Sequence, residues 1–201
     1  MSSFLNVTQK QTYKILSFIL KKKKFTAEEI IKSTKVSKAW VYRIINKLRD
    51  KEFIEKRKKK YMILQATELM GLFHLVRSMK NNKIKSIAIN TDKKTVMKEL
   101  IKRKVIFCLS TALENYSEYL DEPTINFYTN DKKIIEELQA EPKGYTQINI
   151  FKPDLCLETE TEKKGKMRLT SRIRTIIDLI CNEQTYATKA LIETEFGERI
   201  G

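Results

Sequence analysis

The chain is 201 residues long and 41% hydrophobic, with only five glycines and three prolines, which describes an ordered globular protein of one large domain or two small ones. The whole of its formal net charge of +15 comes from residues 1–84, which contain 21 Lys and Arg and 6 Asp and Glu. Residues 85–201 contain 19 basic and 19 acidic residues and are neutral overall. The apolar stretches fall well short of the ~20 residues that cross a bilayer, and the first residues lack a signal-peptide pattern, so we expect a cytoplasmic protein with no membrane partner.

Positive charge that is concentrated in this way predicts a polyanionic partner for the first part of the chain. The cysteines Cys108, Cys156 and Cys181 form no CxxC pair, and His74 is the only histidine. We therefore expect no metal site and no cofactor, and we interpret the cysteines as reduced and buried.

The first part of the chain reads as three helices. Residues 8–21 carry one apolar stripe at helical spacing. Thr26 followed by Glu29 matches a capping box, which predicts a short second helix ending near Ser33. Residues 34–36 make the turn to the third helix.

The third helix is predicted over residues 37–51, with Ser37 as its N-cap. Its inner face is predicted from apolar residues at i, i+3, i+4 and i+7: Val41, Ile44, Ile45 and Leu48. The opposite face collects residue types that read base edges or hold phosphates: Ala39, Tyr42, Arg43, Asn46 and Lys47. Lys38 adds a phosphate ligand beside the favourable N-terminal dipole.

A basic β-hairpin is predicted after this helix, over residues 53–64. Residues 53–57 alternate apolar and polar side chains, residues 61–64 do so more loosely, and Lys58, Lys59 and Lys60 lie between them. Two short strands with a lysine tip make a wing, which in DNA-binding domains lies along the backbone or minor groove beside the recognition helix.

The segment SKAWVYRIINKLRDKEFIEKR, residues 37–57, resembles the recognition helix and first wing strand of winged-helix regulators of the MarR and ArsR kind, and the resemblance extends over about residues 8–80. Those proteins usually have glycine just before the wing strand, where this chain has Glu52. They often have glycine at the wing tip, where this chain has only lysines. The resemblance implies a winged helix-turn-helix DNA-binding domain.

The predicted DNA contacts are therefore Ser37, Lys38, Ala39, Trp40, Tyr42, Arg43, Asn46, Lys47, Arg57, Lys58, Lys59 and Lys60. Arg43 suits a guanine, Asn46 an adenine, and Tyr42 a thymine methyl or a phosphate. Trp40 lies at the edge of the apolar stripe, so packing under the first helix and contact with DNA both remain open.

A further helix is predicted over residues 67–80, and its wide apolar face is a candidate homodimer surface. Residues 81–83 read as a linker, and the charge balance changes at the same point. We accordingly divide the chain into a winged helix-turn-helix domain, residues 1–84, and a partner-binding or regulatory domain, residues 85–201.

The second domain is predicted as a small α/β domain, which makes the whole chain mixed α+β. The expected strands are residues 86–90, 124–128 and 146–151 and a hairpin around residues 164–165; the expected helices are residues 92–103, 110–120, 131–138, 170–181 and 185–196. The strand–helix–strand unit between residues 124 and 151 predicts parallel pairing.

Two fragments, LSTALENY at residues 109–116 and LTSRIRTIIDLI at residues 169–180, resemble the C-terminal domain of abortive-infection antitoxin regulators, the AbiEi-like proteins. In that family a winged helix represses its own operon, and the protein is paired with a nucleotidyltransferase-type toxin. The resemblance implies a protein partner for residues 85–201.

No motif for catalysis was found. The chain lacks the GxxxxGK[ST] and GxGxxG phosphate loops and the Gly-Ser start with paired Asp of a nucleotidyltransferase. Glu158, Glu160 and Glu162 alternate with threonines, and a solvated edge strand explains them better than a metal site. We predict that the protein is not an enzyme.

Three functions remain. The leading one is sequence-specific binding of double-stranded DNA by a transcriptional regulator. The second is an antitoxin-type protein-interaction module that autoregulates its operon. The third is RNA binding, which ranks last because only Trp40, Tyr42 and Tyr61 are candidates for base stacking.

Overall fold

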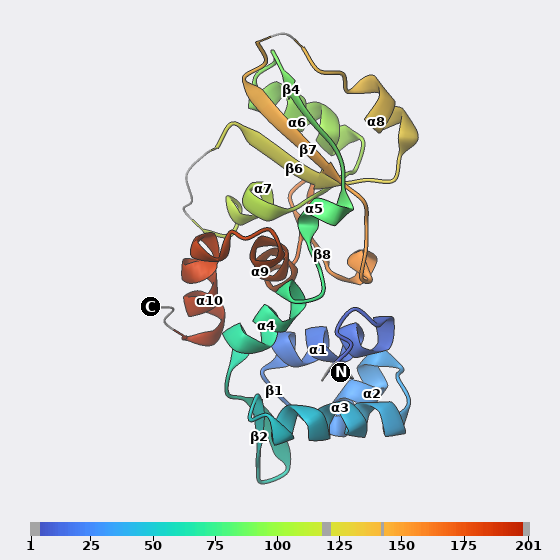
Figure 1. Ribbon diagram of the computed structural model, residues 1–201, viewed down its shortest axis with the longest axis vertical. Helices are drawn as coiled ribbons and strands as arrows, with labels where there is room; N and C mark the ends of the chain where they lie inside the picture. The colour runs from blue at the N-terminus through green and yellow to red at the C-terminus, as the bar shows by residue number, and fades with distance from the viewer. Residues whose placement is uncertain (1–4, 118–121, 142, 199–201) are drawn as a thin grey trace.

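The computed structural model describes residues 5–117, 122–141 and 143–198. A winged helix fills the lower end of Figure 1, a mixed β-sheet with helices fills the upper end, and helices α4, α9 and α10 lie between them. The predicted mixed α/β class is confirmed.

The winged helix is built from α1 (Lys10–Lys22), α2 (Ala27–Thr34), α3 (Lys38–Asp50), β1 (Lys24–Phe25), β2 (Ile54–Arg57) and β3 (Lys60–Ile63). The predicted capping box is confirmed, since the Thr26 hydroxyl accepts the Glu29 N–H and the Glu29 carboxylate accepts the Thr26 N–H at 2.7 Å. The predicted wing is also confirmed. Strand β1 was not predicted; it pairs with β3 inside a run of lysines.

Two wing residues adopt a backbone conformation that favours glycine. Glu52, just before the wing strand, has φ 58°, and Lys58 at the tip has φ 55°. A side chain in this left-handed region costs roughly 1–2 kcal/mol. The wing therefore forms without the glycines that such hairpins usually carry, and it stores some strain.

The second part contains β4 (Lys83–Ile89), β5 (Ile106–Phe107), β6 (Thr124–Tyr128), β7 (Thr146–Phe151), β8 (Thr161–Lys164) and β9 (Met167–Thr170), in the order β4-β7-β6-β5-β9-β8. Strands β6 and β7 are parallel, as predicted. One face of the sheet is covered by α6 (Lys93–Lys102) and α8 (Lys132–Glu137), which share an apolar cluster with β6 and β7.

The remaining helices are α4 (Ala66–His74), α5 (Met79–Asn82), α7 (Leu109–Leu113), η1 (Leu157–Thr159), α9 (Arg172–Cys181), η2 (Thr185–Thr188) and α10 (Lys189–Phe196). Three predictions about the elements need correction. The single helix expected over residues 67–80 is divided, since α4 ends at His74 and α5 begins at Met79. The helix expected over residues 110–120 is the short α7, and residues 118–120 lie outside the described residues. The expected linker, residues 81–83, forms the end of α5 and the first residue of β4.

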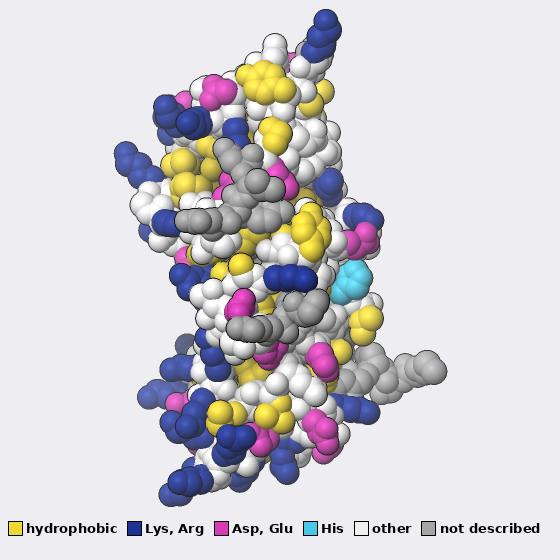
Figure 2. Space-filling view, turned by 90° about the vertical axis from the view of Figure 1, so that its left-hand side faces the viewer, with side chains coloured by type: hydrophobic (Ala, Val, Ile, Leu, Met, Phe, Trp, Pro, Cys, Tyr) yellow, Lys and Arg dark blue, Asp and Glu magenta, His cyan; other side chains and the backbone are white. Residues whose placement is uncertain are grey.

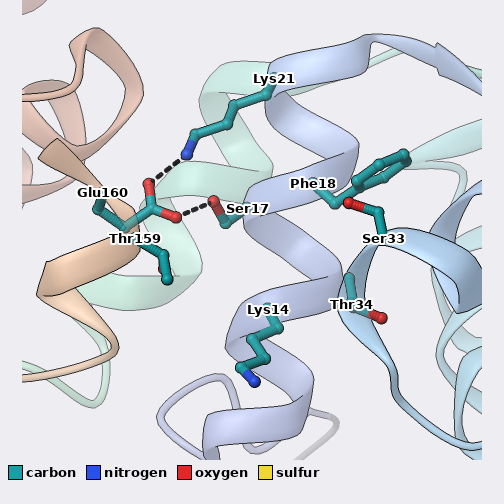
Figure 3. Close-up of a pocket in the computed structure, with 8 residues that line it drawn as sticks. All are labelled: Lys14, Ser17, Phe18, Lys21, Ser33, Thr34, Thr159 and Glu160. Carbon is teal, nitrogen blue, oxygen red and sulfur yellow. Dashed lines mark hydrogen bonds and ion pairs between the residues drawn. The ribbon is translucent and has the colours of Figure 1, made fainter. Parts of the chain in front are cut away.

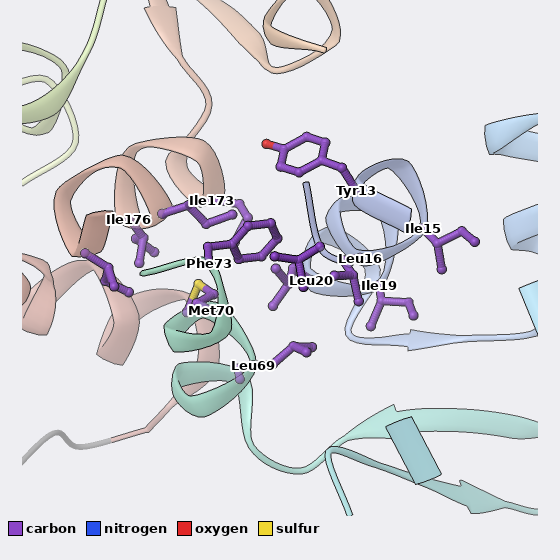
Figure 4. Close-up of a cluster of buried hydrophobic side chains, with 14 of the residues drawn as sticks. Tyr13, Ile15, Leu16, Ile19, Leu20, Leu69, Met70, Phe73, Ile173 and Ile176 are labelled. Atoms are coloured by element: carbon purple, nitrogen blue, oxygen red, sulfur yellow. The ribbon is translucent and has the colours of Figure 1, made fainter. Parts of the chain in front are cut away.

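The apolar face expected to make a dimer is used inside the molecule. Leu69, Met70 and Phe73 of α4 are fully buried, and they pack between α1 and α9 (Figure 4). On this stretch only Leu75 and Val76 are exposed large apolar residues. This face is therefore not available as a dimer surface, because the chain's own helices cover it.

A single hydrophobic cluster joins the two parts of the chain, since it includes α1, α3 and α4 as well as α7, α9 and α10. The division at residue 84 stays a prediction about independent folding. What the structure describes is an interface that is packed as a core.

A buried ionic network lies in the same interface. Arg174 of α9, with none of its surface exposed, donates to Asp178 at 2.8 Å and to Asp154. Arg77, which follows α4, also donates to both aspartates, at 2.8 Å each. Two arginines and two aspartates therefore cancel in charge where the helix after the wing meets the second part of the chain.

Two tyrosines complete this network. Tyr128 donates to Asp178 at 3.0 Å, and Tyr13 of α1 accepts a hydrogen bond from Arg174 at 3.3 Å. Burial raises the pKa of Tyr128 well above its ordinary value, so its hydroxyl keeps the proton that it donates.

The acidic residues of the predicted edge strand do not share a strand. Glu158 belongs to η1 and Glu162 to β8, while Glu160 between them is 4% exposed. Glu160 accepts a hydrogen bond from Ser17 at 2.6 Å and pairs with Lys21 at 2.9 Å, so it fastens the second part of the chain to α1 (Figure 3). The prediction of a solvated row was therefore wrong for Glu160. Across the three described ranges, no group of His, Cys, Asp and Glu could hold a metal ion.

Replacing Arg174 with Leu should lower the free energy of unfolding by about 3–5 kcal/mol, because the network loses one of its two arginines and keeps an uncompensated aspartate charge. Lys80→Ala is the control, since it breaks the exposed Lys80–Glu183 pair, which is worth at most about 1 kcal/mol. Urea unfolding measures both, and equal effects would contradict a buried network that holds the interface.

Lys58→Gly should leave the free energy of unfolding unchanged or raise it by up to about 1 kcal/mol, because glycine relieves the left-handed backbone. Lys59→Gly is a matched control: it removes the same charge at the same tip, but Lys59 is not among the residues with positive φ. It should lower stability by about 0.5–1 kcal/mol. Urea unfolding that ranks the two variants in the opposite order would exclude this wing geometry.

Candidate nucleic-acid interface

The buried residues of α3 determine which face of the helix points outward. Val41, Ile44, Ile45 and Leu48 are each at most 3% exposed, as predicted, and they hold the helix against α1 and α2. Ser37 is the N-cap, because its hydroxyl accepts the Trp40 N–H at 3.4 Å. The opposite face of the helix is thereby turned outward.

The predicted contact residues of α3 lie on that outer face or at its edge. Ser37, Lys38, Ala39, Arg43 and Asn46 are exposed, and Trp40, Tyr42 and Lys47 are half-buried. Arg57, Lys58, Lys59 and Lys60 are exposed on the wing. In Figure 1 the wing projects from the same end of the molecule that α3 closes, and Figure 2 shows Lys and Arg side chains gathered over this end.

Tyr42 is held by a residue that sequence reasoning missed. Its hydroxyl donates to the Glu28 carboxylate of α2 at 3.4 Å, and the Lys38 ammonium lies 5.9 Å from the centre of its ring. The negative charge of Glu28 raises the pKa of Tyr42 above its ordinary value. Glu28 therefore places a carboxylate beside a face that is otherwise basic.

Trp40 and Arg43 contact each other. The guanidinium carbon of Arg43 lies 3.6 Å from the centre of the indole ring, which is a close cation–π contact. The indole Nε1 is out of contact with solvent and has no hydrogen-bond partner among the described residues. Trp40 is therefore partly buried: it packs against the edge of the core, and Arg43 lies on one face of its ring.

Contacts within the wing hold its two strands together, and a distant residue caps the helix that follows the wing. Arg57 pairs with Glu55 on β2, and the Lys56 ammonium lies 5.9 Å from the ring centre of Tyr61 on β3. The Glu198 carboxylate caps α4, the next helix, where it accepts the N–H groups of residues 66 and 67 at 2.8 and 3.0 Å. No local sequence signal announces that cap, because more than 130 residues separate its two sides.

The comparison with protein families identifies the same segment. Residues 5–70, which are 66 of the 201, match the family model described as "Sugar-specific transcriptional regulator TrmB". The match runs from the segment before α1 into α4 and supports a winged helix-turn-helix of the kind that DNA-binding transcriptional regulators carry. No curated protein and no solved structure matches the chain.

The matched family differs from the MarR and ArsR families, so the sequence resemblance holds at the level of the winged helix-turn-helix regulator. The resemblance of residues 109–116 and 169–180 to AbiEi-like proteins stays a prediction. Within the part of the chain that the structure describes, no helix is both long enough and apolar enough to cross a membrane.

Glu28→Gln should lower the pKa of Tyr42 towards its ordinary value, because the carboxylate that opposes loss of the phenolic proton is gone. Ring chemical shifts followed against pH by NMR measure this. Glu68→Gln, on the exposed first turn of α4, is the control and should leave Tyr42 unchanged. An unchanged Tyr42 pKa in Glu28→Gln would mean that the hydrogen bond does not persist in solution.

Proposed function

We propose that the chain is a transcriptional regulator that binds double-stranded DNA sequence-specifically, with α3 in the major groove and the wing, residues 53–64, on the phosphate backbone. The observation that carries this proposal is the placement of the exposed face of α3 and the lysine tip at one end of a segment that matches a DNA-binding family. A helix of this kind fits the major groove, where each base pair presents a distinct hydrogen-bonding pattern.

The contact residues divide by chemistry. Arg43 and Asn46 are exposed and suit guanine and adenine, and Tyr42 reaches a thymine methyl or a phosphate once it leaves Glu28. The remaining residues position the protein on the backbone: Ser37, Lys38, Ala39, Trp40, Lys47, Arg57, Lys58, Lys59 and Lys60. Phosphate contacts supply affinity that depends on salt, and base contacts supply specificity.

The triple variant Lys58→Ala, Lys59→Ala and Lys60→Ala should weaken binding to every duplex and flatten the slope of log K against log salt by about 0.9 for each lost phosphate contact. Titration of labelled duplex DNA and matched RNA at several salt concentrations measures this. The control removes three exposed lysines from α6 and α8: Lys94, Lys98 and Lys132. An equal loss in the control would show that net charge, and not the wing, drives binding.

Arg43→Ala should cost about 1–3 kcal/mol of binding free energy on a duplex selected by the wild-type protein and blur the preference at one base pair. Competition among selected and singly mutated duplexes measures this. An equal loss on all sequences would remove Arg43 from base reading, and tighter binding of matched RNA would favour an RNA-binding winged helix.

The finer parts of the proposal concern partners. A symmetric operator needs a dimer or cooperative monomers. Residues 85–201 are proposed to bind a protein partner, as in an antitoxin-type regulator, and the resemblance of residues 109–116 and 169–180 to AbiEi-like proteins supports this. Light scattering of the protein alone and bound to DNA gives its oligomeric state.

A further inference from the structure

The indole N–H of Trp40 is an anomaly on the face proposed to bind DNA. Nitrogen Nε1 can only donate, it has no contact with solvent, and no acceptor among the described residues meets it. A buried donor without a partner costs free energy, and buried tryptophan N–H groups usually find an acceptor. The free protein therefore carries an unmet hydrogen bond at the start of its proposed recognition helix.

Arg43 stacks on one face of the same side chain. Its guanidinium lies against the indole ring at 3.6 Å, and the structure gives Arg43 no ion pair or hydrogen bond with a described residue. The cation–π contact therefore holds the Arg43 guanidinium in place while its five N–H donors have no acceptor among the described residues. The two residues are one helical turn apart, at positions i and i+3, so they act as a local pair.

We infer that Trp40 and Arg43 form a closed pair that opens on DNA: Arg43 leaves the ring to reach a base edge, and the indole, released from that contact, turns so that its N–H donates to a backbone phosphate. This inference rests on the proposed function. It assigns to Trp40 a phosphate contact that its place at the edge of the core conceals, and it links that contact to base reading by Arg43.

Two physical features support this assignment. Trp40 lies in the first turn of α3, where backbone N–H groups and the helix dipole favour a phosphate. A phosphate oxygen bears charge and accepts more strongly than a neutral group. DNA thus offers the acceptor that the folded protein lacks.

The experiment uses the fact that Trp40 is the only tryptophan of the chain. Replacing tryptophan biosynthetically with 3-benzothienylalanine, which has sulfur in place of the N–H group, alters one site and nearly preserves its shape. We expect affinity to fall about tenfold on a selected duplex and on a scrambled one alike, because the lost contact is to phosphate. The midpoint of urea unfolding should not fall.

Trp40→Phe is the genetic counterpart, with an aromatic ring that still stacks under Arg43. It should lose affinity on both duplexes, whereas Arg43→Ala should chiefly lose the distinction between them. In the unmodified protein, Trp40 fluorescence should shift when the duplex saturates the protein, and it should shift in the same direction in free Arg43→Ala.

The outcomes separate the two proposals. If the unmodified protein binds no duplex, the proposed function fails. If it binds, but benzothienylalanine leaves affinity unchanged or Trp40 emission does not respond to DNA, the inference alone is overturned. A loss of affinity that appears only together with a lower unfolding midpoint would make Trp40 a packing residue and overturn it too.

Discussion

Four charged side chains, of which Arg77, Arg174 and Asp178 are buried and Asp154 is partly exposed, decide how the two parts of this protein meet. Arg174 and Asp178 lie on α9, Arg77 follows α4, and Asp154 follows β7, so the network ties three separate segments together. Removing any one member leaves an uncompensated charge in a setting of low polarity, which is why such groups tolerate few alternative arrangements. The apolar contacts of α1, α4 and α9 around them bury apolar surface, and the ionic groups fix how the three helices are arranged.

This constraint reaches the proposed DNA-binding face through α1 and α4. Tyr13 on α1 accepts from Arg174, and Glu160 fastens the same helix through Ser17 and Lys21. Helix α1 in turn supports α2 and α3. The proposed recognition helix, α3, is therefore held by a scaffold that extends through the second part of the chain, and not by a small domain on a flexible linker.

Sequence patterns predicted the features that depend on neighbouring residues. The capping box of Thr26 and Glu29 spans four positions, and the stripe from Val41 to Leu48 repeats within one helix, so both could be predicted. Strand β1 is two residues long and exists because β3 lies beside it. The contact of Glu28 with Tyr42 and the placement of Glu160 depend on tertiary packing, which no local pattern encodes. The alternation of residues 158–162 was misleading for the same reason, since a turn separates its members.

The carboxylate of Glu198 on the first turn of α4 bears on the order of events during synthesis. Residues 5–70 leave the ribosome long before α9 and α10 exist, and until then the side of α4 that packs on α9 has nothing to cover it. The winged helix therefore emerges with α4 uncapped and partly exposed on its apolar side. Glu198, which caps α4, is added more than a hundred residues later. A nascent chain in this condition exposes apolar surface to which chaperones bind, and the core behind the winged helix closes only after α9 and α10 have been made.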